Sequence, residues 1–337
     1  MRERRVSVAA NFNTRGAAGL ACALLVAAIF ASGPTNTASA AEFGSSPYPK
    51  GFSDIFSGIV PTEPGLYALN DLYHYDGNVG ATVFNGAVQL GVEAKFTADF
   101  LTLTYVTKWK VLGGTYAFGV APSVMSMDTN VGLSLPSFTG PRGRHFGPFT
   151  FNFGDTDTAL GDTGITPAVI GWHAGNFYWN VGVSGLAPTG DYSISNLAST
   201  SLNHWSVFPT FAITYWDQKS GWQISSAFAY AVNFENPATD YTSGDIFHND
   251  GCITKMFGAL QVGAVGYATV QTTPDSGRGA KLGANESQVY GVGPIVAYTL
   301  GAGKPKPLTL VVKWYHEFDA KNTFEGDTVV GSASFQF

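Results

Sequence analysis

Large apolar and small polar side chains alternate along much of this chain, with the two-residue period that is typical of a half-buried β-strand. In the segment 222–234 the even positions carry mostly Trp, Ile, Phe, Tyr and Val, whereas the odd positions carry Gln, Ser, Ala and Asn. The segments 101–109, 260–271 and 308–314 alternate in the same way. Their apolar faces often end in an aromatic residue, the placement expected where a strand meets a membrane–water interface.

About twelve such segments follow one another, and an even number is what a single-chain membrane barrel requires. We place them near 65–75, 97–109, 114–127, 162–174, 176–188, 203–216, 221–234, 246–257, 259–272, 287–300, 307–319 and 327–337. The connections alternate between short turns and long loops, and the long ones are 76–96, 128–161, 189–202, 235–245 and 273–286. We therefore predict an all-β fold, an up-and-down antiparallel transmembrane β-barrel over residues 65–337, with both chain ends in the periplasm.

Four prolines lie inside these predicted strands, although proline lacks the N–H that a strand ladder uses. They are Pro122, Pro167, Pro209 and Pro294. We expect bulges or positions at the barrel rim there.

Residues 1–40 are predicted to be a cleaved secretory signal peptide. Four arginines precede an uncharged apolar run at 16–31, and Ala38-Ser39-Ala40 suits signal peptidase. Residues 41–64 contain four prolines and read as an irregular lead-in segment. Our default expectation places that segment in the periplasm, with the barrel mouth as the alternative.

The chain stops at Phe337, and Phe335 lies on the same face of the last predicted strand. A terminal strand that ends in phenylalanine is a widely used outer-membrane assembly signal, so we expect the barrel-assembly machinery to recognise these residues. The alternative is a last strand that ends in Phe by chance.

Charge narrows the possible partners. Charged residues make up 12% of the chain, against about 25% in an ordinary soluble domain. Residues 1–40 hold four of the 18 basic and one of the 24 acidic residues, so the remainder has a formal charge of −9, which argues against nucleic acid. Outer-membrane lipid and lipopolysaccharide are the surroundings expected of such a barrel. Cys252 is the only cysteine after residue 40, so an internal disulfide is excluded and a small buried residue is expected.

Several strings go beyond architecture, and they occur in a fixed order along the chain. They include Pro64-Gly65-Leu66-Tyr67, the run 106–114 (VTKWKVLGG), Leu160-Gly161-Asp162, the run 171–177 (GWHAGNF), the run 187–192 (APTGDY) and the run 235–245 (ENPATDYTSGD). Together they resemble the meta-pathway phenol-degradation family of outer-membrane proteins, from about Pro64 to Phe337. The resemblance implies a transporter-like barrel for small hydrophobic or aromatic compounds. It supplies no catalytic residues to carry over.

Inward-facing residues of a barrel decide what passes through it. From the strand parity we expect a solute path lined by Lys108, Asn180, Gln223, Asn233, Gln261, Lys313 and Glu317. Lys313 and Glu317 share one face of a strand. They would contact a solute or, as we favour, pair across the lumen and hold its walls. A barrel of about twelve strands should have a narrow lumen.

Our leading hypothesis is a passive outer-membrane channel for small hydrophobic or aromatic solutes, without cofactor and without enzymatic activity. The first alternative is a lipid-hydrolysing barrel enzyme, because His204 and Ser206 lie two residues apart on one predicted strand face. The sequence shows no third group to orient that histidine, which nucleophilic catalysis requires. The second alternative is a structural barrel with a plugged lumen.

Three acidic residues of a predicted loop, Asp155, Asp157 and Asp162, would suit calcium through their oxygens, as would Asp240 with Asp245. We expect solvated loop charge instead, because no calcium-loop spacing is present. No zinc-type Cys/His spacing and no phosphate-binding glycine loop is found either. Basic residues at 142–145 would suit lipopolysaccharide phosphates, and ordinary solvation is again the favoured reading.

Overall fold

The computed structural model describes residues 46–83, 88–135, 137–139, 143–280 and 286–337, so the predicted signal peptide lies outside the described residues. No helix among these residues has the length and apolar character needed to cross a membrane. The strands are β1 (Gly65–Val83), β2 (Val88–Val111), β3 (Gly114–Ala121), β4 (Ser123–Leu135), β5 (Phe138–Thr139), β6 (His145–Phe146), β7 (Phe149–Leu160), β8 (Thr163–Ala174), β9 (Phe177–Ala187), β10 (Ser206–Asp217), β11 (Trp222–Asn233), β12 (Ile246–Phe257), β13 (Leu260–Gln271), β14 (Gln288–Leu300), β15 (Leu308–Lys321) and β16 (Glu325–Gln336).

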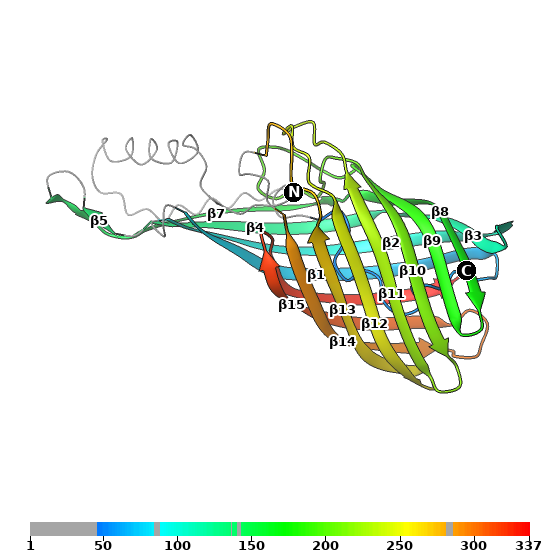
Figure 1. Ribbon diagram of the computed structural model, residues 1–337. Helices are drawn as coiled ribbons and strands as arrows, with labels where there is room; N and C mark the ends of the chain where they lie inside the picture. Colours follow the sequence, from blue (N-terminus) through cyan, green and yellow to red (C-terminus); the bar gives the residue numbers. More distant parts are fainter. Residues whose placement is uncertain (1–45, 84–87, 136, 140–142, 281–285) are drawn as a thin grey trace.

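The main sheet closes into an antiparallel barrel of twelve strands, as the alternation predicts. β1 pairs with β2 on one side and with β16 on the other. From β16 the strands pair in reverse chain order down to β8, which pairs with β3, and β3 pairs with β2 to complete the ring. β3 with β4, and β7 with β8, each act as one strand interrupted near its middle. Figure 1 shows the barrel strands running obliquely between an end with short turns and an end with long loops.

The expected disturbances occur at two of the prolines. Pro122 separates β3 from β4, and the register between β8 and β9 shifts between Ile165 and Ala168, around Pro167. Proline cannot donate to a neighbouring strand, so the ladder bends or breaks where one occurs.

Strand parity agrees with the alternation. On β15, Lys313, Tyr315 and Glu317 point inward and are at most 1% exposed, whereas Val312 and Trp314 point outward and are 59% and 42% exposed. β11 and β13 follow the same rule. The outward apolar side chains form the lipid-facing surface that a membrane barrel needs.

Two of the expected long loops are strands for much of their length. β1 continues to residue 83 and β2 already begins at residue 88, so most of the first loop is strand. In the second loop, β4 continues to residue 135 and β7 covers 149–160. Their outer parts form a sheet, here called the fin: residues 77–83, 88–96, 126–135 and 149–158. The fin projects beyond the barrel at the long-loop end, with β5 and β6 at its tip (Figure 1). The loop expectation is wrong there because alternation continues past the length that a membrane crossing requires.

The lead-in segment occupies the barrel interior, so our default expectation of a periplasmic location is wrong. Residues 46–64, here called the lumen segment, contact inward side chains of β1, β9, β10, β12, β13 and β15. The segment begins near the long-loop end, where Ser46 meets His248, and leads into β1 at the short-turn end. The interior is therefore filled by the protein's own chain.

Candidate functional site

Two buried ion pairs fasten the lumen segment to β15. Lys50 Nζ lies 2.7 Å from Glu317 Oε1, and Lys313 Nζ lies 2.8 Å from Asp54 Oδ2. The Glu317 and Lys313 side chains are fully buried. Tyr75 and Tyr267 also donate to Glu317, at 2.8 and 2.6 Å. Both buried charges of β15 therefore have a counter-charge, which offsets the cost of burying them in a low-dielectric interior.

These contacts decide between the two expectations for Lys313 and Glu317. Both residues are paired, as favoured, but their charged partners are Lys50 and Asp54 of the lumen segment and not the opposite wall. Lys313 also donates to the carbonyl of Phe52, at 2.9 Å.

Asp250 of β12 holds a turn of the lumen segment. Its carboxylate accepts from the backbone amides of Gly51, at 3.2 Å, and Ser53, at 2.9 Å, and from the hydroxyl of Tyr48, at 3.1 Å. Burial and the nearby Asp250 carboxylate raise the pKa of Tyr48 well above its ordinary value, so the phenol stays a neutral donor. Gly51 has a positive φ of 67°, and a Cβ there would lie 2.7 Å from the Tyr315 ring. Glycine is therefore required at this turn.

Apolar contacts complete the attachment. Phe52 meets Phe100 edge to face, with ring centroids 5.5 Å apart, and Phe56 meets Trp216 at 5.1 Å. Ile55 packs against the buried cluster that includes Cys252 of β12. Aromatic pairs of this kind add about 0.5–1.5 kcal/mol each beyond the area they bury.

Residues Ser57 and Gly58 of the lumen segment lie so close to β9 and β10 that their backbone contacts these strands directly. The amide of Gly58 donates to Thr214 Oγ1 at 2.9 Å, and Asn180 Nδ2 donates to the Ser57 carbonyl at 2.8 Å. A Cβ on Gly58 would lie 2.5 Å from the Thr214 backbone nitrogen. Any larger residue must therefore displace the segment from the wall.

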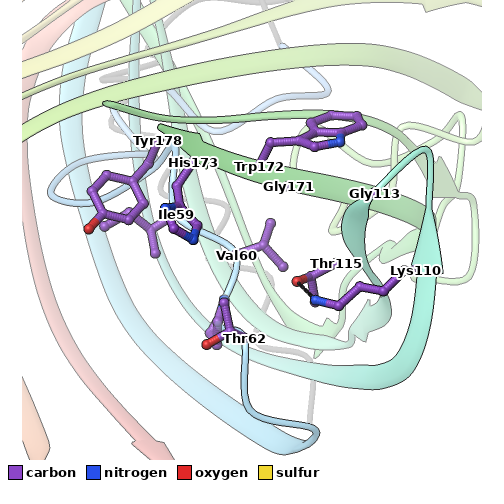
Figure 2. Close-up of a pocket in the computed structure, with 11 residues that line it drawn as sticks. Ile59, Val60, Thr62, Lys110, Gly113, Thr115, Gly171, Trp172, His173 and Tyr178 are labelled. Carbon is purple, nitrogen blue, oxygen red and sulfur yellow. Dashed lines mark hydrogen bonds between the residues drawn. The ribbon is translucent and has the colours of Figure 1, made fainter. Parts of the chain in front are cut away.

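A cavity of about 350 Å³ opens where the segment leaves the barrel interior. Ile59, Val60 and Thr62 of the segment line one side, and residues of β3, β8 and β9 line the other. Figure 2 shows His173 and Tyr178 beside Ile59, and Lys110 bonded to Thr115. That Lys110 Nζ–Thr115 Oγ1 distance is 2.7 Å, and the His173 and Tyr178 rings stack with centroids 5.7 Å apart. The short-turn mouth thus has mixed polar and aromatic walls.

The other predicted lumen residues are mostly buried among polar partners. Gln223 is 0% exposed and accepts from Thr254 and Gln261, whose amide also donates to Thr254 at 2.6 Å. Asn233 is buried and donates to the Gly244 carbonyl at 2.8 Å. Lys108 differs, because it is exposed near the short-turn end, where the β2–β3 register shifts. Apart from Lys108, these residues are packed against other residues of the barrel interior.

His204 and Ser206 are neighbours, but their geometry does not suit lipid hydrolysis. Ser206 is 0% exposed, lies on the inward face and donates to Asn233 Oδ1 at 2.8 Å. Its oxygen lies 3.4 Å from His204 Nδ1. A nucleophile in this position has no access to bilayer lipid. Among the described residues no carboxylate is hydrogen-bonded to His204, whose Nδ1 lies 3.1 Å from the Trp205 carbonyl oxygen.

The fin has two unlike faces. Its outer face carries polar side chains such as Asn78, Glu93, Asn130 and Asn152, which are exposed. The face that continues the inner wall of the barrel carries Thr129, Asp155 and Asp157 at its root. Beyond the root it is apolar, and its side chains are only partly covered: Val79, Val92, Val131, Leu133, Phe149, Phe151 and Phe153. The polar outer face shows that the fin stands outside the lipid layer, because lipid-facing positions would be apolar.

The fold and the site together define a twelve-stranded membrane β-barrel with an occupied lumen. The chain belongs to the family whose sequence model is described as "Putative MetA-pathway of phenol degradation", and the match covers residues 71–333. This confirms the resemblance given by the sequence strings. No protein with a curated description matches the chain significantly.

Solved structures agree on the architecture. The COG4313 outer membrane channel from Pseudomonas putida F1 is similar with a TM-score of 0.57 at 12% identity, covering 83% of this chain and all of that one. A Pseudomonas aeruginosa FadL homologue gives a TM-score of 0.44 at 8% identity, over 90% of this chain and 99% of its own. At this identity the first likeness establishes a shared fold, and the second is too low to establish even that.

Proposed function

We propose that this protein is a passive channel of the bacterial outer membrane for small hydrophobic or aromatic compounds, without cofactor and without catalysis. The single observation that carries the proposal is the apolar inner face of the fin. It continues the interior wall of the barrel through Tyr73, Tyr75 and Phe96, which pack with the buried Ala98. A hydrophobic solute would gain contact there before it reaches the lumen.

The occupied lumen supports the same proposal. A wide water-filled pore would serve hydrophilic solutes, whereas here the lumen segment and its partners fill the interior. Passage then requires the segment to shift, or a route beside it towards the cavity at Ile59 and Val60. The role of Phe335 and Phe337 in barrel assembly, the lipid and lipopolysaccharide surroundings and the signal peptide over 1–40 remain parts of this proposal.

The test compares uptake of toluene or phenol with uptake of arabinose, in a strain that lacks the gene and in the same strain expressing it. We expect expression to raise uptake of the aromatic probe and to leave sugar uptake unchanged. Equal rates with and without the protein, or faster sugar uptake alone, would show that the proposed function is wrong.

A further inference from the structure

Two carboxylates are buried at the root of the fin, where β7 meets the loop 188–205. Asp155 and Asp157 are 8% and 7% exposed. They are two positions apart on β7, so both side chains face the same side of the strand, with their Cα atoms about 7 Å apart. The expectation of solvated loop charge is therefore wrong for these two residues, because they lie on a strand and are shielded from water.

Each of these carboxylates has an oxygen that lacks a partner. Asp155 Oδ2 accepts from the backbone amides of Leu197, at 3.0 Å, and Ala198, at 3.3 Å. Asp155 Oδ1 and Asp157 Oδ2 are shielded from solvent, and neither has a hydrogen-bond partner among the described residues. Within the same part of the chain, no lysine or arginine lies at ion-pair distance from either carboxylate. Burying a carboxylate without a counter-charge is strongly unfavourable, so a cation bound between the two would stabilise the pair.

An independent observation comes from the loop that covers this root. Asn196 directly precedes the Leu197 amide that binds Asp155, so it lies at the same junction. It is 9% exposed, and both Oδ1 and Nδ2 of its side chain lack hydrogen-bond partners within the described chain. Thr129 of β4 pairs in register with Asp155, so its side chain lies on the same face, and it is 8% exposed. Asn196 thus adds a buried side chain with unused polar atoms at the junction that holds Asp155, and Thr129 adds a hydroxyl on the strand face of Asp155.

Asp162, a short distance along the chain, shows what a purely structural carboxylate looks like in the same region. Its Oδ1 accepts from the Gly190 amide at 3.0 Å, and its Oδ2 accepts from the Leu202 amide at 2.8 Å. Both of its oxygens are therefore used in anchoring the loop. Asp155 uses one oxygen in this way, and the remaining oxygens of Asp155, Asp157 and Asn196 are left for a ligand.

We propose that Asp155, Asp157 and Asn196 bind a calcium ion that ties the root of the fin to the loop 188–205. Ca²⁺ takes six to eight oxygen ligands in irregular geometry, from carboxylates, amide carbonyls and water. Mg²⁺ demands a strict octahedron and gives up its water reluctantly, so it fits a buried and irregular oxygen set less well. The absence of sulfur and imidazole from the set also disfavours zinc. The ion fixes the loop across the long-loop mouth of the barrel.

The test is a calcium titration, by isothermal calorimetry, of the full-length mature barrel in detergent after chelator treatment. We expect one Ca²⁺ per barrel, with a dissociation constant of about 10⁻³ M or lower, the range of extracellular calcium sites. Asp157→Asn and Asn196→Ala should each weaken binding by about tenfold or more, because even the loss of an outer-shell partner costs that much. Asp191→Asn is the matched control, since Asp191 is an exposed carboxylate of the same loop. It should bind as the wild type does.

Limited proteolysis gives a second readout. Calcium should slow cleavage within 188–205 in the wild type and in Asp191→Asn, and should have no effect in Asn196→Ala. Heat-dependent migration in detergent gels reports whether each variant forms a barrel, and Asn196→Ala remains decisive if Asp157→Asn does not fold. Absence of saturable calcium binding, equal binding by all variants, or equal binding of Mg²⁺ would overturn the assignment.

Discussion

Lys50 Nζ and Glu317 Oε1 lie 2.7 Å apart in the middle of the barrel, and Asp54 with Lys313 repeats the pair with its charges reversed. Lys50 and Asp54 are four residues apart on the lumen segment, and Lys313 and Glu317 are four residues apart on β15. Because the polarities are opposite, a segment shifted by four residues would place like charges together. The two pairs therefore determine the register in which the segment lies.

Breaking the first pair should destabilise the attached segment. In Lys50→Met, Glu317 keeps its two tyrosine donors but loses its counter-charge, and breaking a buried pair in this way costs about 3–5 kcal/mol. We expect a lower unfolding temperature and a larger, fluctuating ion conductance in planar bilayers.

The double exchange Lys50→Glu with Glu317→Lys is the matched control for this pair. It restores opposite charges at the same two positions, so it should recover part of the lost stability and quieten the conductance. If Lys50→Met already conducts and unfolds as the wild type does, the ion pair does not hold the segment.

Gly58→Ala tests the closest backbone approach. The new Cβ would lie 2.5 Å from the Thr214 nitrogen, so the segment must leave the wall of β10. We expect a raised conductance with the barrel itself intact. Gly331→Ala is the control, because a Cβ at that position of β16 meets nothing within 4 Å. Unchanged conductance in Gly58→Ala would show that the segment tolerates displacement without opening a path.

Cys252 provides a reporter that needs no new mutation. Its side chain is 6% exposed and lies in the cluster against which Ile55 packs. We expect slow labelling of the native barrel by a water-soluble thiol reagent, and labelling about tenfold faster or more in Gly58→Ala, following the open population. Rapid labelling of the native protein would mean that the segment leaves the lumen readily on its own.

Phe153→Asp tests the apolar face of the fin. Phe153 is 52% exposed, so its replacement should leave folding intact while placing a charge on the face where we propose that solutes first bind. We expect slower uptake of toluene. Asn152→Asp adds the same charge to the opposite face and should have no effect. Equal effects of the two substitutions would show that the apolar face of the fin does not capture the solute.

The sequence predicts the barrel well, because apolar and polar residues alternate along each strand and so indicate which side faces lipid. Parity alone predicts that Lys313, Glu317 and Gln223 face the interior, and the structure places them there. The sequence prediction places loops where the fin lies, although Val92, Ala94 and Phe96 continue the alternation against Glu93 and Lys95. The alternation there continues beyond the length that a membrane-crossing strand requires, so it predicts strand but not where the strand leaves the membrane.

The lumen segment could not be located in the same way. Its four prolines interrupt any regular alternation of apolar and polar residues. The sequence of the segment therefore does not predict which part of the barrel it contacts. Its partners are distant in the chain: Lys50 and Glu317 are separated by 267 positions, and Tyr48 and Asp250 by 202. Lys50 and Asp54 carry the only local hint, since their spacing of four matches that of Lys313 and Glu317.

The lumen segment leads directly into β1, and β1 closes the cylinder by pairing with β16 from Tyr67↔Gln336 to Asn78↔Glu325. Its partners on β9, β10, β12 and β15 exist as a surface only after those later strands have been made and joined. The first described residues of the chain are therefore among the last to find their places. Because their contacts span the greatest sequence separations, the pairing of β1 with β16 should be the slow step of folding. This pairing encloses the lumen segment inside the closed barrel.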